Sequence, residues 1–215
     1  MSFSLPDGSK FFISTGVAAA LTVSGLSNAN PAVATSTAHG LLAGDEILLY
    51  SGWEDANESV FRVASPAANT FAVSGLDTTD TQWFPAGTGT GTAAKISGWQ
   101  EIQQLTNVAA SGGDAQFATV ELLSRRNAIQ IPTRFNATSL TLTMADDPNL
   151  AGYQALQSAS RGLKQRAFKL LLAGGGTAYG FGYVALNEMP QLNKGQVNTV
   201  TASLSLTGRF IRYSS

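Results

Sequence analysis

Strict alternation of apolar and hydroxyl side chains marks two segments in the C-terminal half of the chain. Residues 138–144 set three apolar side chains against three hydroxyls, namely Leu140, Leu142 and Met144 against Ser139, Thr141 and Thr143. Residues 197–208 repeat the pattern, with Val200, Ala202, Leu204 and Leu206 against Thr199, Thr201, Ser203 and Ser205. Because successive side chains of a strand point to opposite faces, both segments predict strands with one face on a core and the other in water.

Shorter β-prone segments fill most of the remaining chain. Turns rich in Gly, Ser, Asn and Pro separate the runs at 10–23, 44–50, 59–64, 69–74, 97–108 and 115–123. A Gly-Gly-Gly-Thr segment within residues 165–189 predicts a β-hairpin there. This succession favours a mainly β sandwich or barrel over an alternating βαβ fold.

One helix is predicted between these strands, over residues 148–161. Asp147 is placed as its N-cap, and Pro148 as its first residue, where a missing N–H costs nothing. Small and apolar side chains form one stripe at helical spacing: Ala151, Ala155, Leu156, Ala159 and Leu163. Arg161 suits the negative end of the helix dipole, and Gly162 is expected to cap the helix.

The chain is poor in charge. Charged residues make up 13% of its 215 residues, against roughly 25% in an average soluble protein. Such a surface predicts burial in an assembly. The net charge is −1, without the excess of Lys and Arg from which nucleic-acid binders draw their affinity, so sequence-specific DNA binding is not expected.

Several classes of site and location are excluded by what the chain lacks. It has no cysteine, which excludes disulfides, thiolate metal sites and cysteine nucleophiles. Its N-terminal residues do not combine a basic segment with an apolar run, so a signal peptide is not expected. No apolar run approaches the 18 residues of a membrane helix.

His39 is the single histidine, and Asp45 and Glu46 follow it closely. A metal site at His39 would need carboxylates alone as its other ligands, which is unusual for zinc. As a general base, His39 would need a nucleophile within reach, and the chain has so many serines that counting alone does not exclude one. Gly40 and Gly44 favour a turn before a strand instead. We therefore predict no catalytic, metal-binding or cofactor-binding residue.

Other groups of residues also have structural interpretations. The adjacent Asp146 and Asp147 fit a helix start, and the glycines of 87–92 and 174–182 match neither a P-loop nor a dinucleotide fingerprint. Three tryptophans are predicted to pack in cores rather than to form a carbohydrate-stacking platform: Trp53, Trp83 and Trp99. Arg125 and Arg126 are predicted to lie on an exposed linker or at a subunit contact rather than on DNA.

The order of these segments resembles the tail tube (major tail) proteins of long-tailed, non-contractile bacteriophages. The resemblance runs through 111–160, with "QIPT", "SLTLTM" and "DDPNLAGYQAL" in succession, and resumes over 167–208 with "VNTVTASLSLTG". Residues 30–96 resemble a small β module found inserted in phage virion proteins. The first 29 residues carry the least of the resemblance.

The resemblance implies a mainly β fold of two parts. Residues 1–29 and 97–215 would form a β-sandwich or barrel-type tail tube domain with one flanking α-helix. Residues 30–96 would form a small all-β inserted domain that projects outward. Six copies would close a ring, their inner sheets would join into one barrel, and rings would stack into a hollow tube in the virion, after assembly in the host bacterial cytoplasm.

The implied partners are further copies of the chain, other tail proteins at the tube ends, and DNA and tape measure protein passing through the lumen. No cofactor and no membrane is implied. The candidate lumen residues are the hydroxyl faces of the two alternating strands: Ser139, Thr141, Thr143, Thr199, Thr201, Ser203 and Ser205. Arg125 and Arg126 are candidates for a subunit contact. Lumens of this family are expected to be acidic, whereas the near-neutral charge of this chain leaves the charge of the bore open.

Two other functions stay open from the sequence. A carbohydrate-binding or adhesive virion module would use residues 30–96 and their tryptophans at a host cell surface. A hydrolase would use His39 as its base. Assembly into rings or tubes would distinguish the tube protein from both.

Overall fold

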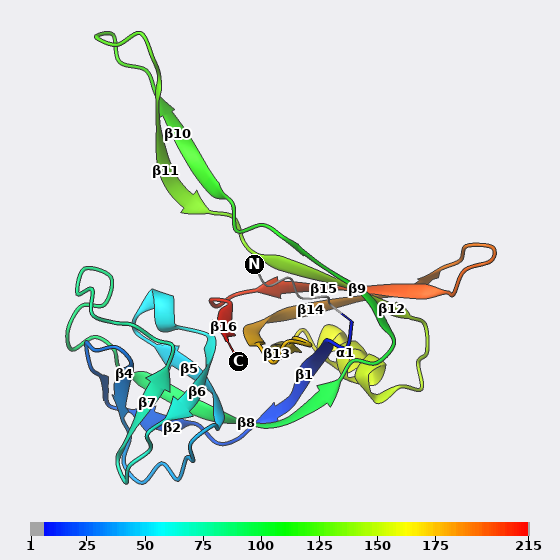
Figure 1. Cartoon of the computed structure of the whole chain (residues 1–215), viewed down its shortest axis with the longest axis horizontal. Coiled ribbons are helices and arrows are strands. Elements are labelled where there is room, and N and C mark those ends of the chain that lie inside the picture. Colours follow the sequence, from blue (N-terminus) through cyan, green and yellow to red (C-terminus); the bar gives the residue numbers. More distant parts are fainter. Residues whose placement is uncertain (1–6, 215) are drawn as a thin grey trace.

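Residues 7–214, which the computed structural model describes, form sixteen strands, one α-helix and one short 3-10 turn (Figure 1). This confirms the predicted mainly β fold with one helix. The first elements are β1 (Lys10–Val17), β2 (Leu21–Val23), β3 (Gly25–Leu26), β4 (Ala32–Thr35), β5 (Glu46–Ser51), η1 (Glu54–Ala56), β6 (Ser59–Ala64) and β7 (Thr70–Ser74). The others are β8 (Gly91–Glu101), β9 (Leu105–Ser111), β10 (Ala115–Val120), β11 (Ile129–Phe135), β12 (Ser139–Ala145), α1 (Ala151–Arg161), β13 (Gln165–Leu171), β14 (Thr177–Gln191), β15 (Thr199–Leu206) and β16 (Ile211–Tyr213).

One long, curled antiparallel sheet connects most of these strands. Its order is β3-β4-β7-β6-β5-β8-β1-β13-β14-β15-β12-β9, with β2 added on β8 and β16 on β14. The first half of β8 pairs with β2 and β5, and its second half pairs with β1. Strands β10 and β11 form a separate two-stranded sheet, which projects from the body in Figure 1.

Residues 21–96, which we call the small lobe, pack around a core of their own. Its most buried large side chains include Ile47, Trp53, Phe61 and Phe71. Val23 and Leu26 belong to this core, although they precede residue 30, the expected start of the inserted part. They do so because β2 pairs with β8 and β3 pairs with β4, which brings both residues onto the small lobe.

The main lobe comprises β1 and the chain from residue 97 onward, and its core confirms the predicted alternation. The four apolar residues of β15 and the three of β12 are buried, while the hydroxyl residues between them are at least partly exposed. Tyr153, Leu156 and Ala159 of α1 pack in the same core together with Phe11 and Phe168.

The helix begins at Ala151, so the predicted start at residue 148 is wrong. Asp147 forms a turn before the helix instead of capping it: its Oδ1 accepts the N–H of Asn149 at 3.1 Å, and its carbonyl accepts that of Leu150 at 3.2 Å. The C-terminal end also differs from the simple glycine cap. Gly162 keeps a right-handed conformation, and Leu163, with φ of 47°, is the left-handed residue. The bonds from the Leu163 N–H to Ser160 and from the Lys164 N–H to Ala159 complete a Schellman motif.

Gly152 lets the helix approach the end of β8 closely. A Cβ at this position would lie 2.5 Å from the Glu101 carbonyl oxygen and 2.8 Å from Ile102 Cα. Because both are backbone atoms, we expect Gly152→Ala to lower the free energy of unfolding by about 1–3 kcal/mol, despite the better helix propensity of alanine. Urea unfolding checks this. Gly174→Ala is the control, because no atom lies within 4 Å of that Cβ; equal stabilities of the two variants would contradict the close approach.

Candidate assembly surfaces

The main lobe presents a continuous face of small polar side chains. Strands β12 and β15 pair so that Ser139 lies opposite Ser205, Thr141 opposite Ser203, Thr143 opposite Thr201, and Ala145 opposite Thr199. The seven candidate lumen residues therefore share one face of the sheet.

This face extends onto the strands at either side. On β14, Tyr183, Ala185 and Asn187 lie opposite Ser205, Ser203 and Thr201; on β9, Asn107, Ala109 and Ser111 lie opposite Thr143, Thr141 and Ser139. None of these thirteen side chains is charged. The sequence did not reveal the six flanking residues because five of them are alanine, asparagine or tyrosine, which do not continue the Ser/Thr pattern. The sequence offers one sign that β9 continues the face: the apolar Val108 alternates with Asn107 and Ala109, which lie on the face.

The sheet that bears this face has an open edge on each side. Strand β9 pairs with β12 alone, and β14 pairs with β13 only as far as Tyr183. Residues 184–191 of β14 thus have no strand beside them on the β13 side within the described part of the chain. Helix α1 meets this edge at one point, where Ser160 Oγ accepts the Leu186 N–H at 3.0 Å. Because β14, β15, β12 and β9 alternate in direction, β9 runs opposite to β14. Two copies side by side can therefore join these edges as an ordinary antiparallel pair.

Apolar surface accompanies both open edges. A groove of about 640 Å³ lies beside β9, and apolar side chains dominate its wall: Leu105, Val108, Ala110, Leu140, Leu170 and Leu206. At the far end of β14 and in the loop that follows, Met189, Leu192 and Val197 are 71–76% exposed. A neighbour joined at these edges would cover apolar side chains that water now contacts.

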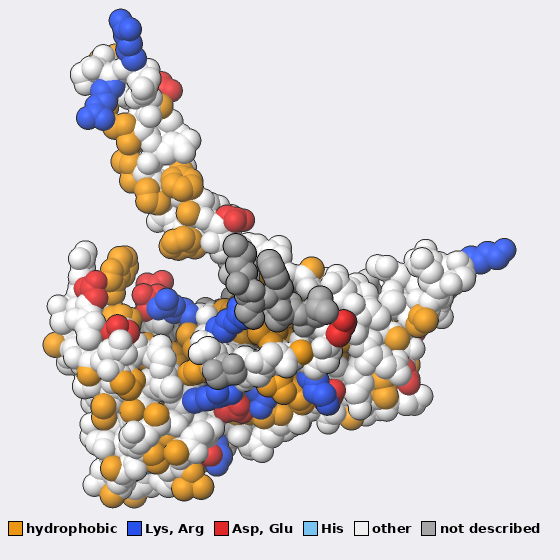
Figure 2. Space-filling view, viewed as in Figure 1, with side chains coloured by type: hydrophobic (Ala, Val, Ile, Leu, Met, Phe, Trp, Pro, Cys, Tyr) orange, Lys and Arg blue, Asp and Glu red, His pale blue; other side chains and the backbone are white. Residues whose placement is uncertain are grey.

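Strands β10 and β11 form a projecting arm (residues 115–135). The segment was predicted as a strand followed by a linker, but the linker contains the second strand. Phe117 lies opposite Pro132 and Ile131 opposite Ala118, so apolar residues occupy both faces of the arm. Phe117, Ile131 and Phe135 are 50–76% exposed, and Figure 2 shows hydrophobic side chains along the arm. An isolated two-stranded hairpin is at best marginally stable in water, which points to a partner that covers it.

Arg125 and Arg126 lie in the turn between β10 and β11, at the tip of the arm. Both are exposed, and basic side chains are visible at the end of the arm in Figure 2. Leu123, in the same turn, is fully exposed. The structure thus confirms that the two arginines are exposed; whether they contact another subunit stays a prediction.

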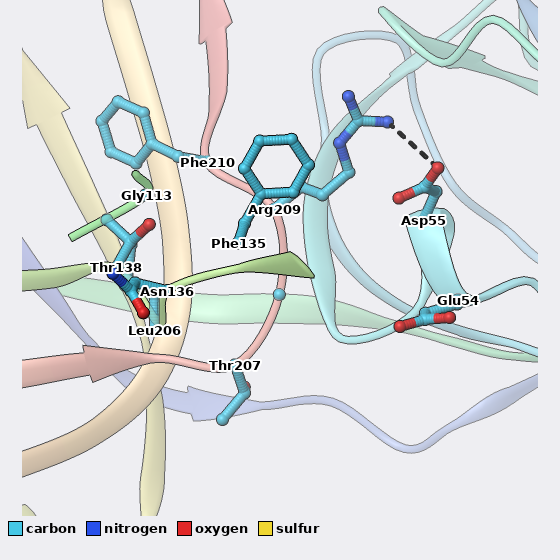
Figure 3. Close-up of a pocket in the computed structure, with 11 residues that line it drawn as sticks. Glu54, Asp55, Gly113, Phe135, Asn136, Thr138, Leu206, Thr207, Arg209 and Phe210 are labelled. Atoms are coloured by element: carbon cyan, nitrogen blue, oxygen red, sulfur yellow. Dashed lines mark ion pairs between the residues drawn. The ribbon is translucent and has the colours of Figure 1, made fainter. Parts of the chain in front are cut away.

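A polar cleft of about 370 Å³ lies where the small lobe, the base of the arm and the segment after β15 meet (Figure 3). Glu54 and Asp55 of η1 line it from the small lobe, and Phe135 and Phe210 line it from the main lobe. Arg209 points toward Asp55, with Nη1 4.0 Å from Oδ2. Such a long and solvent-exposed ion pair contributes little stability, so Asp55 is available to a better partner.

A part-buried carboxylate joins the two lobes. Glu46 of the small lobe lies 3.1 Å from Lys169 Nζ, and it accepts hydrogen bonds from the Trp99 indole and the Tyr179 phenol. Burial, together with the bond to Glu46, raises the pKa of the Tyr179 phenol well above its ordinary value, so this phenol keeps its proton.

Arg62 extends the same junction. Its Nε donates to the Tyr179 hydroxyl at 2.9 Å, and its guanidinium lies 4.8 Å from the ring centre of Tyr213. The Tyr213 hydroxyl in turn donates to the Ser74 carbonyl at 2.7 Å. We call these contacts, together with those of Glu46, the lobe junction. They fix the small lobe against β13, β14 and β16.

His39 is a buried side chain that is hydrogen-bonded to the backbone. It is buried against Phe71, its Nδ1 accepts the Leu41 N–H at 3.0 Å, and its Nε2 lies 3.2 Å from the Thr70 carbonyl oxygen. Within residues 7–214, no group of three or more His, Cys, Asp or Glu side chains is placed to hold a metal ion.

The tryptophans do not form a platform. Trp53 is buried against Phe84, and Trp99 donates to Glu46 at the lobe junction. Trp83 is 66% exposed, so the prediction that it packs in a core is wrong. The Asn28 amide holds the surrounding loop by donating to the Thr78 and Phe84 carbonyls. In this loop the Phe84 side chain is buried and that of Trp83 points outward. The described residues also contain no helix that is long and apolar enough to span a membrane.

Comparison with solved structures finds tube and tube-associated assemblies. The chain is similar to the SPP1 tail tube, with 14% identity, 55% of this chain and 70% of that chain covered, and a TM-score of 0.43. It is also similar to a chain of the anti-feeding prophage baseplate, with 13% identity, 55% and 86% covered, and a TM-score of 0.41. A chain of the cap that terminates the anti-feeding prophage tube gives 14% identity, 54% and 83% covered, and a TM-score of 0.37.

No curated protein matches the chain. The model of the phage tail tube protein family matches residues 51–215, which is more than half of the sequence. This match agrees with the resemblance carried by the order of segments from 111 to 208. Proteins of this family are structural, so the chain is a structural protein and not an enzyme. The chain belongs to the phage tail tube protein family, and its place is the tail of the virion.

Proposed function

We propose that the protein closes into hexameric rings that stack into the tail tube, through which the tape measure protein and DNA pass. One observation carries the proposal: β14, β15, β12 and β9 share an uncharged face, and the open edges of β9 and of residues 184–191 of β14 run in opposite directions. Edge strands of this kind are a liability in a monomer, and closure of a barrel removes them. The six-fold number comes from the resemblance to tail tube proteins.

The dimensions of such a barrel suit a conduit. Six copies of four strands give 24 strands, which at about 4.8 Å spacing and about 40° tilt close into a barrel roughly 48 Å across at the backbone. The side chains that would line it are short, because serine, threonine, alanine and asparagine predominate among the thirteen face residues. A bore of this size leaves room for a nucleic-acid duplex.

The chemistry of the face suits passage rather than binding. Affinity for DNA comes mainly from Lys and Arg that displace counterions from phosphates, and the thirteen face residues include neither. The bore would therefore be hydroxyl-rich and nearly neutral, in place of the acidic lumen expected from the family. DNA would neither be retained nor strongly repelled.

The small lobe would lie on the outside of the tube. In the sheet order, β1, β13 and β14 separate its strands from β15 and β12, which carry most of the uncharged face. Further copies of the chain and the tail proteins at the two tube ends are its proposed partners, with assembly in the cytoplasm of the bacterial host.

Proline substitutions at two consecutive residues of β9 test ring closure. Ala109 and Ala110 are neighbours, so one N–H points toward β12 and the other toward the open edge. We expect one of Ala109→Pro and Ala110→Pro to destabilise the subunit, because it removes a ladder hydrogen bond. The other should fold like the parent protein but stay monomeric, because the edge is blocked. Unfolding curves measure the stability of each variant, and light scattering after size-exclusion chromatography measures its oligomeric state. If both variants fold well and still form rings, closure through β9 is contradicted.

A further inference from the structure

We infer that the tip of the arm of one copy binds the cleft of a second copy in the adjacent ring, so that the small lobe takes part in ring stacking. The tip is defined by Leu122–Asn127, and the cleft is the one lined by Glu54, Asp55, Phe135 and Phe210. The inference rests on the proposed function, because it presupposes stacked rings.

The direction of the arm favours a partner in another ring. Residues 112–114 and 136–138 connect the arm directly to the ends of β9 and β12, and two backbone hydrogen bonds hold this base: Gly113 N–H to the Asn136 carbonyl at 3.1 Å, and Asn136 N–H to the Asp114 carbonyl at 2.9 Å. The arm therefore prolongs the strands. Neighbours within a ring join at the sheet edges, to the side of the strands, whereas neighbours in the next ring lie beyond the strand ends.

The arm cannot reach the cleft of its own molecule. About ten residues separate Ala115 from the tip, which at about 3.3 Å per residue places Arg125 roughly 33 Å from the base of the arm. The cleft lies at that base, since Gly113, Phe135 and Asn136 line it. The occupant must therefore come from another molecule, and the same chain supplies both the tip and the cleft.

The two surfaces are complementary in charge. Arg125 and Arg126 carry two positive charges, and neither forms an ion pair within residues 7–214. On the cleft side, Glu54 likewise has no ion-pair partner among the described residues, and Asp55 has only the long contact to Arg209. Arginine pairs with carboxylates through two parallel hydrogen bonds, which specify orientation as well as attraction.

The two surfaces also match in apolar character. Leu123 at the tip is fully exposed and Leu122 is 44% exposed, while Phe135 and Phe210 in the cleft are 76% and 45% exposed. Arginine and aromatic residues at a hollow of this kind are typical of the residues that dominate interface energies. A contact that joins two different surfaces of identical chains is heterologous. Its repetition gives an open array, as the stacking of rings requires.

A charge exchange tests the contact in the full-length protein. We expect Arg125→Glu/Arg126→Glu to form rings but to shorten the stacked tubes at least tenfold in electron micrographs, and Glu54→Lys/Asp55→Lys to do the same. The variant that combines all four substitutions should recover tube length. Lys194→Glu, at the end of the β14–β15 hairpin, is the control and should stack normally. Tubes of parental length in the two reversal variants, or no recovery in the combined one, would overturn the inference. Absence of rings from the parent protein would instead refute the proposed function.

A cross-link provides a second test that does not depend on net charge. The chain has no cysteine, so Ser124→Cys combined with Glu54→Cys offers one thiol at the tip and one in the cleft. Oxidised tubes should give a ladder of disulfide-linked multimers on denaturing gels, and the single variants should give at most dimers. Monomers alone from oxidised tubes of the double variant would contradict the contact.

Discussion

Tubes that carry Thr141→Lys and Ser203→Lys are expected to retain DNA, whereas parental tubes are expected to release it. These two residues lie opposite each other in the middle of the uncharged face, so in a hexamer the substitutions place twelve positive charges around the bore of every ring. Each lysine near a phosphate releases condensed counterions, which makes binding strong at low salt and steeply weaker at high salt.

The measurement is nuclease protection. Tubes are assembled in the presence of a short DNA duplex, separated by sedimentation, and treated with a nuclease that cannot enter the bore. We expect protected DNA from Thr141→Lys/Ser203→Lys tubes at low salt and none from the parental tubes. Thr22→Lys/Ser24→Lys, which changes exposed residues of the small lobe, is the control: it adds the same charge and should bind DNA only where the nuclease can digest it. Equal protection by the control, or none by the bore variant, would show that the hydroxyl face does not line the lumen.

Glu46→Ala is expected to cause the largest loss of stability, about 3 kcal/mol. Its carboxylate holds Lys169 and accepts from both Trp99 and Tyr179, and the Glu46 and Lys169 side chains are only 16% and 21% exposed. Removing one partner of such a pair leaves the other charge without compensation, at a cost of about 3 kcal/mol or more. A loss of this size is a large part of the 5 to 15 kcal/mol, roughly, that stabilises a typical domain.

Urea unfolding of the purified subunit measures this loss, and Glu101→Ala is the matched control. Glu101 pairs with Lys10 at 3.2 Å, but their side chains are 36% and 51% exposed, so this change should cost no more than about 1 kcal/mol. We also expect the small lobe of Glu46→Ala to unfold before the main lobe, because the lobe junction has lost its central acceptor. Equal losses in the two variants, or an unchanged single transition, would contradict the role of Glu46.

The alternating strands could be predicted from the sequence because the side of the strand on which a residue lies decides whether its side chain is buried or exposed. Leu142 and Met144 are buried and Thr141 and Thr143 are not, so the period of two is visible without any knowledge of partner strands. The structural role of His39 was predictable for a similar reason, since its hydrogen bonds go to backbone groups of nearby turns and a strand. The helix start was missed because Asp147 and Pro148 suit a turn as well as an N-terminus.

The arm and the lobe junction were not predictable in the same way. Residues 115–135 have no core to face, so both sides of the hairpin are apolar and no alternation distinguishes them from a linker. The lobe junction joins Glu46 and Arg62 to Tyr179 and Tyr213, which are more than a hundred residues away in the chain. The open edges of β9 and β14 have no sequence signal at all, because their proposed partners belong to other molecules.

Electron cryomicroscopy of the purified, full-length protein would show whether the subunits close into rings around the hydroxyl face. We expect six-fold rings, stacked into tubes, in which β9 of each subunit pairs with residues 184–191 of β14 in the next and Thr141 and Ser203 face the bore. A persistent monomer, or a tube whose lumen is lined by another surface of the subunit, would contradict this expectation.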